Sequence, residues 1–209
     1  MNHPIEGTEL IALDIVCLRT YDDAVANWIA WLTQEEDESR TLCTHIGVMF
    51  DHHNISEQLW RNTLQWFEPN VDKRSVIIFR YTGGFPFFDV VSSIGTPFRL
   101  GGIGRARDYM QKVRGRTYAW WRIPGHAMSG IAGWLGVKLK CKWLLRTSRH
   151  NTICSSHVGR VFERATGDKR FFGMHWADLT PDDIYDYCEQ NPDKFIRIYD
   201  SRFINPKNA

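Results

Sequence analysis

The chain has 209 residues, of which 43% are hydrophobic and 24% are charged, and its formal net charge is +2. This composition supports one sizeable hydrophobic core and excludes a disordered protein. The near balance of charge argues against a nucleic-acid-binding protein, so the local basic clusters at 105–116 and 138–149 are interpreted as solvated faces.

The cysteine pattern indicates reduced thiols. The five cysteines are irregularly spaced and form no CxxC pair, so neither a disulfide framework nor a zinc ribbon is indicated. This favours synthesis in the cytoplasm. The first nine residues are polar and lack an apolar signal core, and no apolar run is long enough to span a bilayer. We therefore expect a protein without a signal peptide and without a membrane span.

Apolar periodicity predicts alternating strands and helices along the chain. Strands are expected at 9–18, 42–50, 63–67, 75–81 and 195–199, and helices at 21–32, 103–113, 154–165 and from Thr180 onward. The polar stretch 51–62 is expected to be a loop or short helix, 83–97 is turn-rich with an apolar stretch at 87–91, and 124–136 is a buried helix or lid. These elements predict one α+β domain over residues 1–209, with a small antiparallel sheet packed against helices.

Cys154 lies at the predicted start of an amphipathic helix. The apolar stripe of that helix comprises Val158, Val161, Phe162 and Ala165. Unpaired N–H groups and the helix dipole at such a position stabilise a thiolate, which lowers the thiol pKa and provides a nucleophile near neutral pH. The alternative interpretation is a buried structural cysteine.

A cysteine nucleophile needs a base, and His45 is the strongest candidate among eight histidines. It lies in the apolar strand 42–50, which holds an imidazole rigidly, and Gly47 allows another group to approach closely. A hydrogen-bonded core histidine is the alternative. The other histidines have polar neighbours and are expected at the surface: His3, His52, His53, His126, His150, His157 and His175.

The sequence predicts neither a metal nor another cofactor. Asp51 with His52 and His53, or Cys43 with His45, could supply ligands, but their spacing is not that of a closed zinc site. The glycine cluster at 101–104 lacks the Lys-Ser/Thr of a phosphate-binding loop and the full dinucleotide-binding spacing.

Six segments together resemble the circularly permuted branch of the papain-like, NlpC-type cysteine hydrolases, which includes YiiX-like and lecithin:retinol acyltransferase-like proteins. In chain order they are LDIV at 13–16, the short helix at 28–32, THIGV at 44–48, GRTYAWW at 115–121, ICSSHV at 153–158 and LTPDDI at 179–184. They are similar to the family's GDIV strand, following helix, SHVGI histidine motif, GxPYxW segment, xCSxLV nucleophile motif and xTPxDL segment. Leu13 replaces the usual glycine.

The resemblance implies a permuted papain-like fold with the nucleophile at a helix N-terminus. Carried over by position, Cys154 is the nucleophile, His45 is the general base, and Tyr118 helps hold the oxyanion together with the Cys154 N–H. Relatives place a polar third residue on the strand after the histidine strand. Glu68 is the first choice for this role, and an alternative alignment offers Arg80, which cannot accept a hydrogen bond.

The function implied is a cysteine-dependent peptidase or amidase acting on peptide or peptidoglycan-like substrates. Two alternatives remain: a lipid acyltransferase or thioesterase, whose sign would be an apolar groove or membrane-binding element, and a non-catalytic structural protein that keeps the fold. The compact chain without a signal sequence would suit a bacteriophage protein associated with a virion and contacting other virion proteins.

Overall fold

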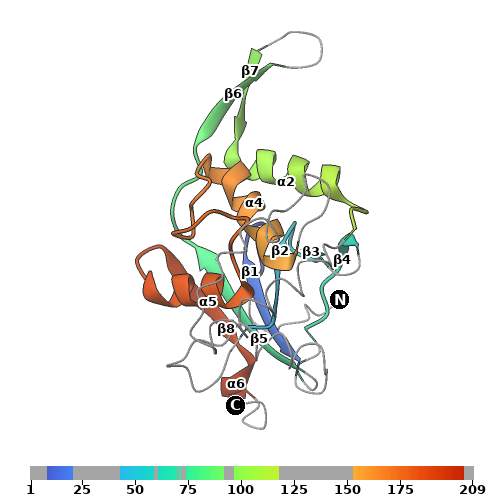
Figure 1. Cartoon of the computed structure of the whole chain (residues 1–209), viewed down its shortest axis with the longest axis vertical. Coiled ribbons are helices and arrows are strands. Elements are labelled where there is room, and N and C mark those ends of the chain that lie inside the picture. The colour runs from blue at the N-terminus through green and yellow to red at the C-terminus, as the bar shows by residue number, and fades with distance from the viewer. Residues whose placement is uncertain are drawn as a thin grey trace, which may run out of the picture.

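The structure, a computed structural model, describes residues 9–20, 43–58, 61–69, 71, 74–91, 97–117 and 153–204. Its helices and strands are labelled in Figure 1. The predicted α+β class is confirmed for this part of the chain, in which helices pack against one antiparallel sheet. The predicted helices at 21–32 and 124–136 lie outside the described residues.

Six strands form the main sheet in the order β4-β3-β2-β1-β5-β8, and all neighbours are antiparallel. The strands are β1 (Ile15–Thr20), β2 (His45–Met49), β3 (Asn54–Gln58), β4 (Asn62–Trp66), β5 (Arg74–Tyr81) and β8 (Phe195–Asp200). Strand β1 pairs with β2 on one side and with β5 on the other. The strand that begins with His45 therefore lies near the middle of the sheet, with β3 beside it.

The described helices are α2 (Gly102–Val113), α4 (Cys154–Thr166), α5 (Pro181–Gln190) and the short α6 (Ser201–Ile204). In Figure 1, helices α2 and α4 lie at the upper end of this sheet, α5 lies beside β8, and α6 lies at the lower end. Helix α4 contacts α2 as well as β2 and β3. A separate two-stranded ribbon, β6 (Phe87–Val91) with β7 (Pro97–Gly101), leads directly into α2. Among the described helices, none combines the length and apolar character needed to cross a lipid bilayer.

The central strands of the main sheet are buried on both faces. Ile15, Ile46 and Val48 belong to a core cluster shared with α4, whereas Val16 and Leu18 belong to a second cluster. Side chains alternate between the faces of a strand. Burial on both faces explains why β1 reads as a continuous apolar run rather than an alternating pattern.

The helix that begins at Cys154 forms as the sequence predicts. Its expected apolar stripe is fully buried, comprising Val158, Val161, Phe162 and Ala165. Gly159 allows close packing, since a Cβ there would lie 2.8 Å from the Trp176 Cβ. The helix ends at Gly167, which takes the left-handed conformation at φ 85°.

The helix start predicted at Thr180 is also confirmed. The Thr180 side chain accepts a hydrogen bond from the N–H of Asp183, and the Asp183 carboxylate accepts one from the N–H of Thr180. Pro181 occupies the first helical position. This reciprocal capping and the proline satisfy or remove backbone donors that would otherwise lack partners at the start of α5.

The prediction of a loop or short helix over 51–62 is wrong. Asp51 accepts hydrogen bonds from the N–H groups of His53 and Asn54, which makes a tight turn, and strand β3 begins at Asn54. Residues Ser56, Glu57 and Gln58 of this strand are all buried. The strand went unrecognised because its buried side chains are polar, so its sequence has no apolar alternation.

Candidate functional site

Cys154 is the first residue of α4, where the backbone offers donors to its sulfur. The preceding residue, Ile153, provides no side-chain cap for the helix. The N–H groups of Ile46 and Ser155 are hydrogen-bonded to the Cys154 sulfur. The thiol is thus held at the junction between the start of the helix and the start of β2, and it is surrounded by donors that favour its anionic form.

His45 joins this thiol to a carboxylate. Its ring is hydrogen-bonded to the Cys154 sulfur, and Nε2 lies 2.8 Å from Oε2 of Glu57 on the neighbouring strand. The side chain of His45 is 22% exposed and that of Glu57 is 7% exposed. The imidazole is therefore reachable from solvent, while the carboxylate behind it is shielded.

The charges of these three groups support one another. Burial opposes ionisation of His45, but the hydrogen bonds and charges of Cys154 and Glu57 outweigh it and raise the pKa of His45 to about 10. Burial raises the pKa of the Cys154 thiol, yet the hydrogen bond and charge of His45 and the two backbone donors produce a net lowering. The pKa of Glu57 is also lowered, because the hydrogen bond and charge of His45 overcome desolvation. These shifts favour the thiolate, imidazolium and carboxylate forms of the three groups over their neutral forms.

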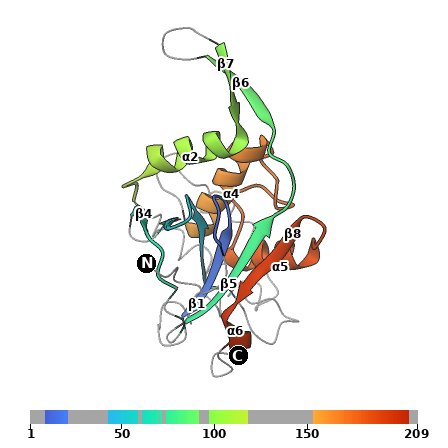
Figure 2. The same ribbon diagram turned by 180° about the vertical axis from the view of Figure 1, so that it is seen from behind.

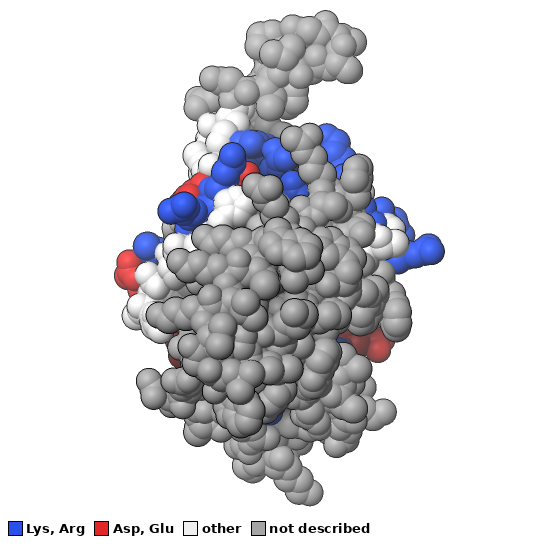
Figure 3. All heavy atoms as spheres, viewed as in Figure 1, with Lys and Arg blue, Asp and Glu red and all other residues white. Residues whose placement is uncertain are grey.

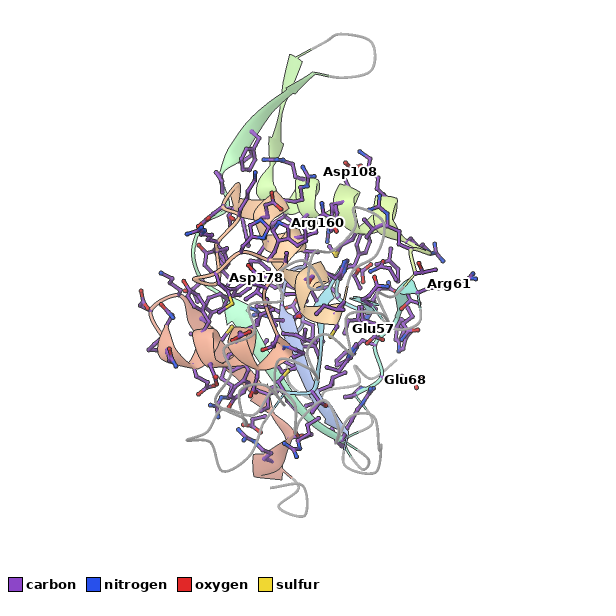
Figure 4. All side chains as sticks on the ribbon, viewed as in Figure 1. Glu57, Arg61, Glu68, Asp108, Arg160 and Asp178 are labelled. Carbon is purple, nitrogen blue, oxygen red and sulfur yellow. The ribbon has the colours of Figure 1, made fainter. Side chains whose placement is uncertain are left out.

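The hydrogen bond expected from Glu68 is made by Glu57 instead. Glu68 follows β4, is exposed, and its carbonyl oxygen accepts a hydrogen bond from Arg74. In the view of Figure 4, Glu57 lies beside the start of α4 and Glu68 lies farther out. The expected third residue lies on the strand beside the histidine strand. That strand is β3, which carries Glu57, and not the strand predicted at 63–67.

Two neighbours fix the Glu57 carboxylate on its other side. The Gln65 amide donates a hydrogen bond to Oε1 of Glu57 from β4. The charge of Arg74 also favours the ionised carboxylate. No local pattern indicates Gln65, because its position beside Glu57 depends on the pairing of β3 with β4, in which the two residues lie diagonally opposite each other.

Gly47 has the close-packing role that the sequence predicts for it. It lies opposite Glu57 in the pairing of β2 with β3. A Cβ at this position would lie 3.2 Å from the Glu57 Cβ and 2.7 Å from Cδ1 of Ile55. A larger residue would clash with the Ile55 side chain and crowd the Cβ of Glu57, whose carboxylate binds His45.

The prediction of a surface position for His157 is wrong. This residue is completely buried in α4, one turn beyond Cys154, and its Nε2 lies 2.9 Å from Oγ of Ser56 on β3. Its ring stacks on that of Tyr109. Burial, together with the charge of Arg160, lowers the pKa of His157 to about 3. A neutral histidine therefore ties the cysteine helix to the strand that carries Glu57.

The structure describes one of the two remaining candidate residues. Tyr118 lies outside the described residues. Arg80 binds Asp14 with two hydrogen bonds, from Nε to Oδ1 at 2.9 Å and from Nη2 to Oδ2 at 2.7 Å. Within the described ranges, no three His, Cys, Asp or Glu side chains converge in a way that could hold a metal ion.

No model of a protein family, no curated protein and no solved structure matches this chain. The function is therefore argued from the geometry and charge of Cys154, His45 and Glu57.

Proposed function

We propose that the protein is a cysteine-dependent hydrolase of amide bonds, with Cys154 as nucleophile, His45 as general base and acid, and Glu57 as the residue that orients His45. The observation that carries this proposal is the continuous hydrogen bonding from the Cys154 sulfur through His45 to Glu57. A nucleophile, a base and a group that fixes the base are the parts that covalent acyl transfer requires.

The reaction begins with attack of the Cys154 thiolate on the carbonyl carbon of the substrate. Because Nε2 of His45 is bonded to Glu57, Nδ1 is the nitrogen left to exchange a proton at the sulfur. Collapse of the tetrahedral intermediate breaks the C–N bond, and the amine leaves with the proton from Nδ1. Water then gives a proton back to Nδ1 and attacks the thioester, which releases a carboxylic acid and regenerates the thiolate.

The oxyanion would be held at the start of α4. The first N–H groups of a helix have no partner within the helix, and the dipole there favours negative charge. Donors already placed where charge develops in the transition state lower the barrier. The family resemblance adds Tyr118 as a further donor. The same resemblance makes a permuted papain-like fold the architecture we propose, with a peptide or peptidoglycan-like substrate.

The test measures amide hydrolysis by the full chain, with purified peptidoglycan and with fluorogenic peptide amides. Wild type should release product, and Cys154→Ala should release none. Cys188→Ala is the matched control, because Cys188 is a buried thiol on α5, and it should keep activity. Turnover that survives Cys154→Ala would overturn the proposed nucleophile. Absence of turnover on every substrate, with no burst of product from an activated ester, would instead favour a structural protein.

A further inference from the structure

A second thiol lies behind the backbone that holds Cys154. Cys43 lies two residues before His45 and is completely buried, in the same core cluster as Cys154. Its Sγ donates a hydrogen bond to the carbonyl oxygen of His45 at 3.3 Å. The thiol therefore contacts the backbone of the residue whose side chain binds the nucleophile.

One peptide group lies between the two thiols. The carbonyl of His45 and the N–H of Ile46 belong to this group, and in a trans peptide they point in opposite directions. The carbonyl accepts from Cys43, and the N–H is hydrogen-bonded to the Cys154 sulfur. The pairing of β2 with β3 begins at Gly47, so this N–H lies just outside that pairing. Cys43 and Cys154 are thus bonded to opposite sides of the same peptide group.

A third thiol extends this line of hydrogen bonds. Cys17 of β1 is buried and is hydrogen-bonded to the Cys43 sulfur. A thiol has one proton, and that of Cys43 is directed at the His45 carbonyl, so the proton between the two sulfurs belongs to Cys17. In both Figure 1 and Figure 2, α4 lies beside β1 and β2, the strands that carry Cys17 and His45.

Cys43 remains a hydrogen-bond donor at neutral pH. Burial raises the pKa of the Cys43 thiol well above its usual range, and the neighbouring Cys17 raises it further. The thiol therefore stays protonated. Consecutive hydrogen bonds polarise one another, and each strengthens the next by about 10–30%. A bond to the His45 carbonyl thus makes the Ile46 N–H on the other side of the peptide group a better donor.

We infer that Cys43 is a positioning residue for the nucleophile, and that its hydrogen bond to the His45 carbonyl fixes and polarises the peptide group whose N–H binds the Cys154 sulfur. This role rests on the proposed function, which makes Cys154 the nucleophile. The thiolate of Cys154 benefits more than the thiol, because a hydrogen bond to a charged group is stronger than one to a neutral group.

The other titratable groups near the two thiols stay the same when Cys43 is replaced. They lie on β1, β2, β3, α2, α4 and α5, and they are Cys17, His45, Glu57, Tyr109, His157, Asp182 and Cys188. Figure 3 shows Lys and Arg side chains over α2, where exposed charges such as those of Lys112 and Arg114 are screened by water and salt. A change in a Cys43 variant therefore reports the loss of its own hydrogen bond.

The experiment measures the rate of alkylation of Cys154 by iodoacetamide against pH in the full chain, with mass spectrometry of the labelled peptide. Cys43→Ala should raise the midpoint of this profile by about 0.3–0.5 pH units, which slows alkylation about two- to threefold below the midpoint. Cys43→Ser keeps a donor on a side chain of similar size, and should hold the midpoint at or below that of wild type. The amide proton resonance of Ile46 should move upfield in Cys43→Ala and not in Cys43→Ser.

Cys188→Ala is the matched control, because Cys188 is a buried thiol of the same core cluster on α5. It should leave the midpoint unchanged. Three results would overturn the inference: an unchanged midpoint in Cys43→Ala, an equal rise in Cys43→Ser, or an equal rise in Cys188→Ala. The first two would show that the donor of Cys43 has no effect on the thiolate, and the third would show that any loss of core packing suffices.

Turnover separates this inference from the proposed function. In an active enzyme the acid limb of the kcat/KM profile should move with the alkylation midpoint, because both report the Cys154 thiolate. A wild type that hydrolyses no amide but has a midpoint dependent on Cys43 would contradict the proposed hydrolase and support the hydrogen bonding. An active wild type whose midpoint is the same in Cys43→Ala would leave the hydrolase in place and overturn the role of Cys43.

Discussion

At the scale of single residues, the candidate site is a row of four hydrogen-bonded side chains. It runs from Cys154 through His45 and Glu57 to Gln65. Each member lies on a different element, namely α4, β2, β3 and β4. The thiolate is favoured because the opposite charge of His45 and two N–H donors together outweigh the cost of burying a charge at Cys154.

Alkylation by iodoacetamide tests the state of the thiol. Cys154 should react first near pH 7, because its pKa lies below that of an ordinary thiol, whereas burial raises the pKa values of Cys17, Cys43 and Cys188. In His45→Ala the stabilising charge is lost, so the rate at pH 7 should fall and its midpoint should move to higher pH. Mass spectrometry of labelled peptides measures both; equal labelling of all thiols would contradict the assignment.

Substitution of each glutamate in turn tests whether Glu57 or Glu68 is the third residue of the site. Glu57→Gln removes the negative charge that helps raise the pKa of His45, so the alkaline limb of the activity profile should move to lower pH. We expect kcat to fall by about 10²-fold or more. Glu68→Gln is the matched control and should leave kcat and the pH profile unchanged. The reverse pattern would restore Glu68 to the role.

At the scale of elements, the turn before β1 contains an unusual residue. Leu13 has φ 73°, a left-handed conformation that costs a non-glycine residue about 1 kcal/mol or more. It is nevertheless 2% exposed, and its N–H donates to the Met49 carbonyl oxygen. In the family motif that this segment resembles, glycine occupies the position. Here the burial of a leucine offsets the backbone strain.

Because of this backbone strain, we expect glycine at position 13 to give a more stable fold than alanine. Leu13→Ala loses burial and keeps the strained backbone, and should destabilise the fold by about 2–5 kcal/mol. Leu13→Gly loses the same burial but releases the strain, so it should be more stable than Leu13→Ala by about 1 kcal/mol. Urea unfolding of the two variants measures the difference. Alanine above glycine in stability would show that the turn is not strained.

At the scale of the whole molecule, the buried polar contact between α4 and β3 makes stability depend on pH. The pKa of His157 is about 3 in the folded chain, against about 6.5 for an unperturbed histidine. As pH falls below 6.5, His157 is protonated in the unfolded chain but stays neutral in the folded chain. This residue therefore lowers stability progressively down to about pH 3.

His157→Gln should remove this dependence, because a glutamine can still bond Ser56 but cannot be protonated. Between pH 6.5 and pH 5 wild type should lose about 1.6 kcal/mol more stability than the variant. Urea unfolding at several pH values gives the comparison, and all other titrating groups are common to both proteins. Parallel pH profiles would indicate that His157 is protonated in the folded state.

The elements whose signals are local could be predicted from the amino-acid sequence. The apolar stripe of α4, the capping residues of α5 and the position of Cys154 at a helix start were all predictable, because side-chain period and capping chemistry act over a few residues. His45 was selected on the same basis, as a rigid histidine in an apolar strand. The order of histidine and cysteine along the chain also came from the sequence alone.

The residues that contact Cys154 and His45 depend on the fold and could not be predicted from local patterns. Strand β3 could not be predicted because its buried residues Ser56, Glu57 and Gln58 are polar. The side chain of each forms a hydrogen bond with a residue from another part of the chain. The choice of Glu57 over Glu68 depends on strand order, and the burial of His157 depends on the packing of α4 against β3. Apolar periodicity reports where side chains avoid water, but a polar side chain is buried only where a partner exists, and that partner is set by the fold.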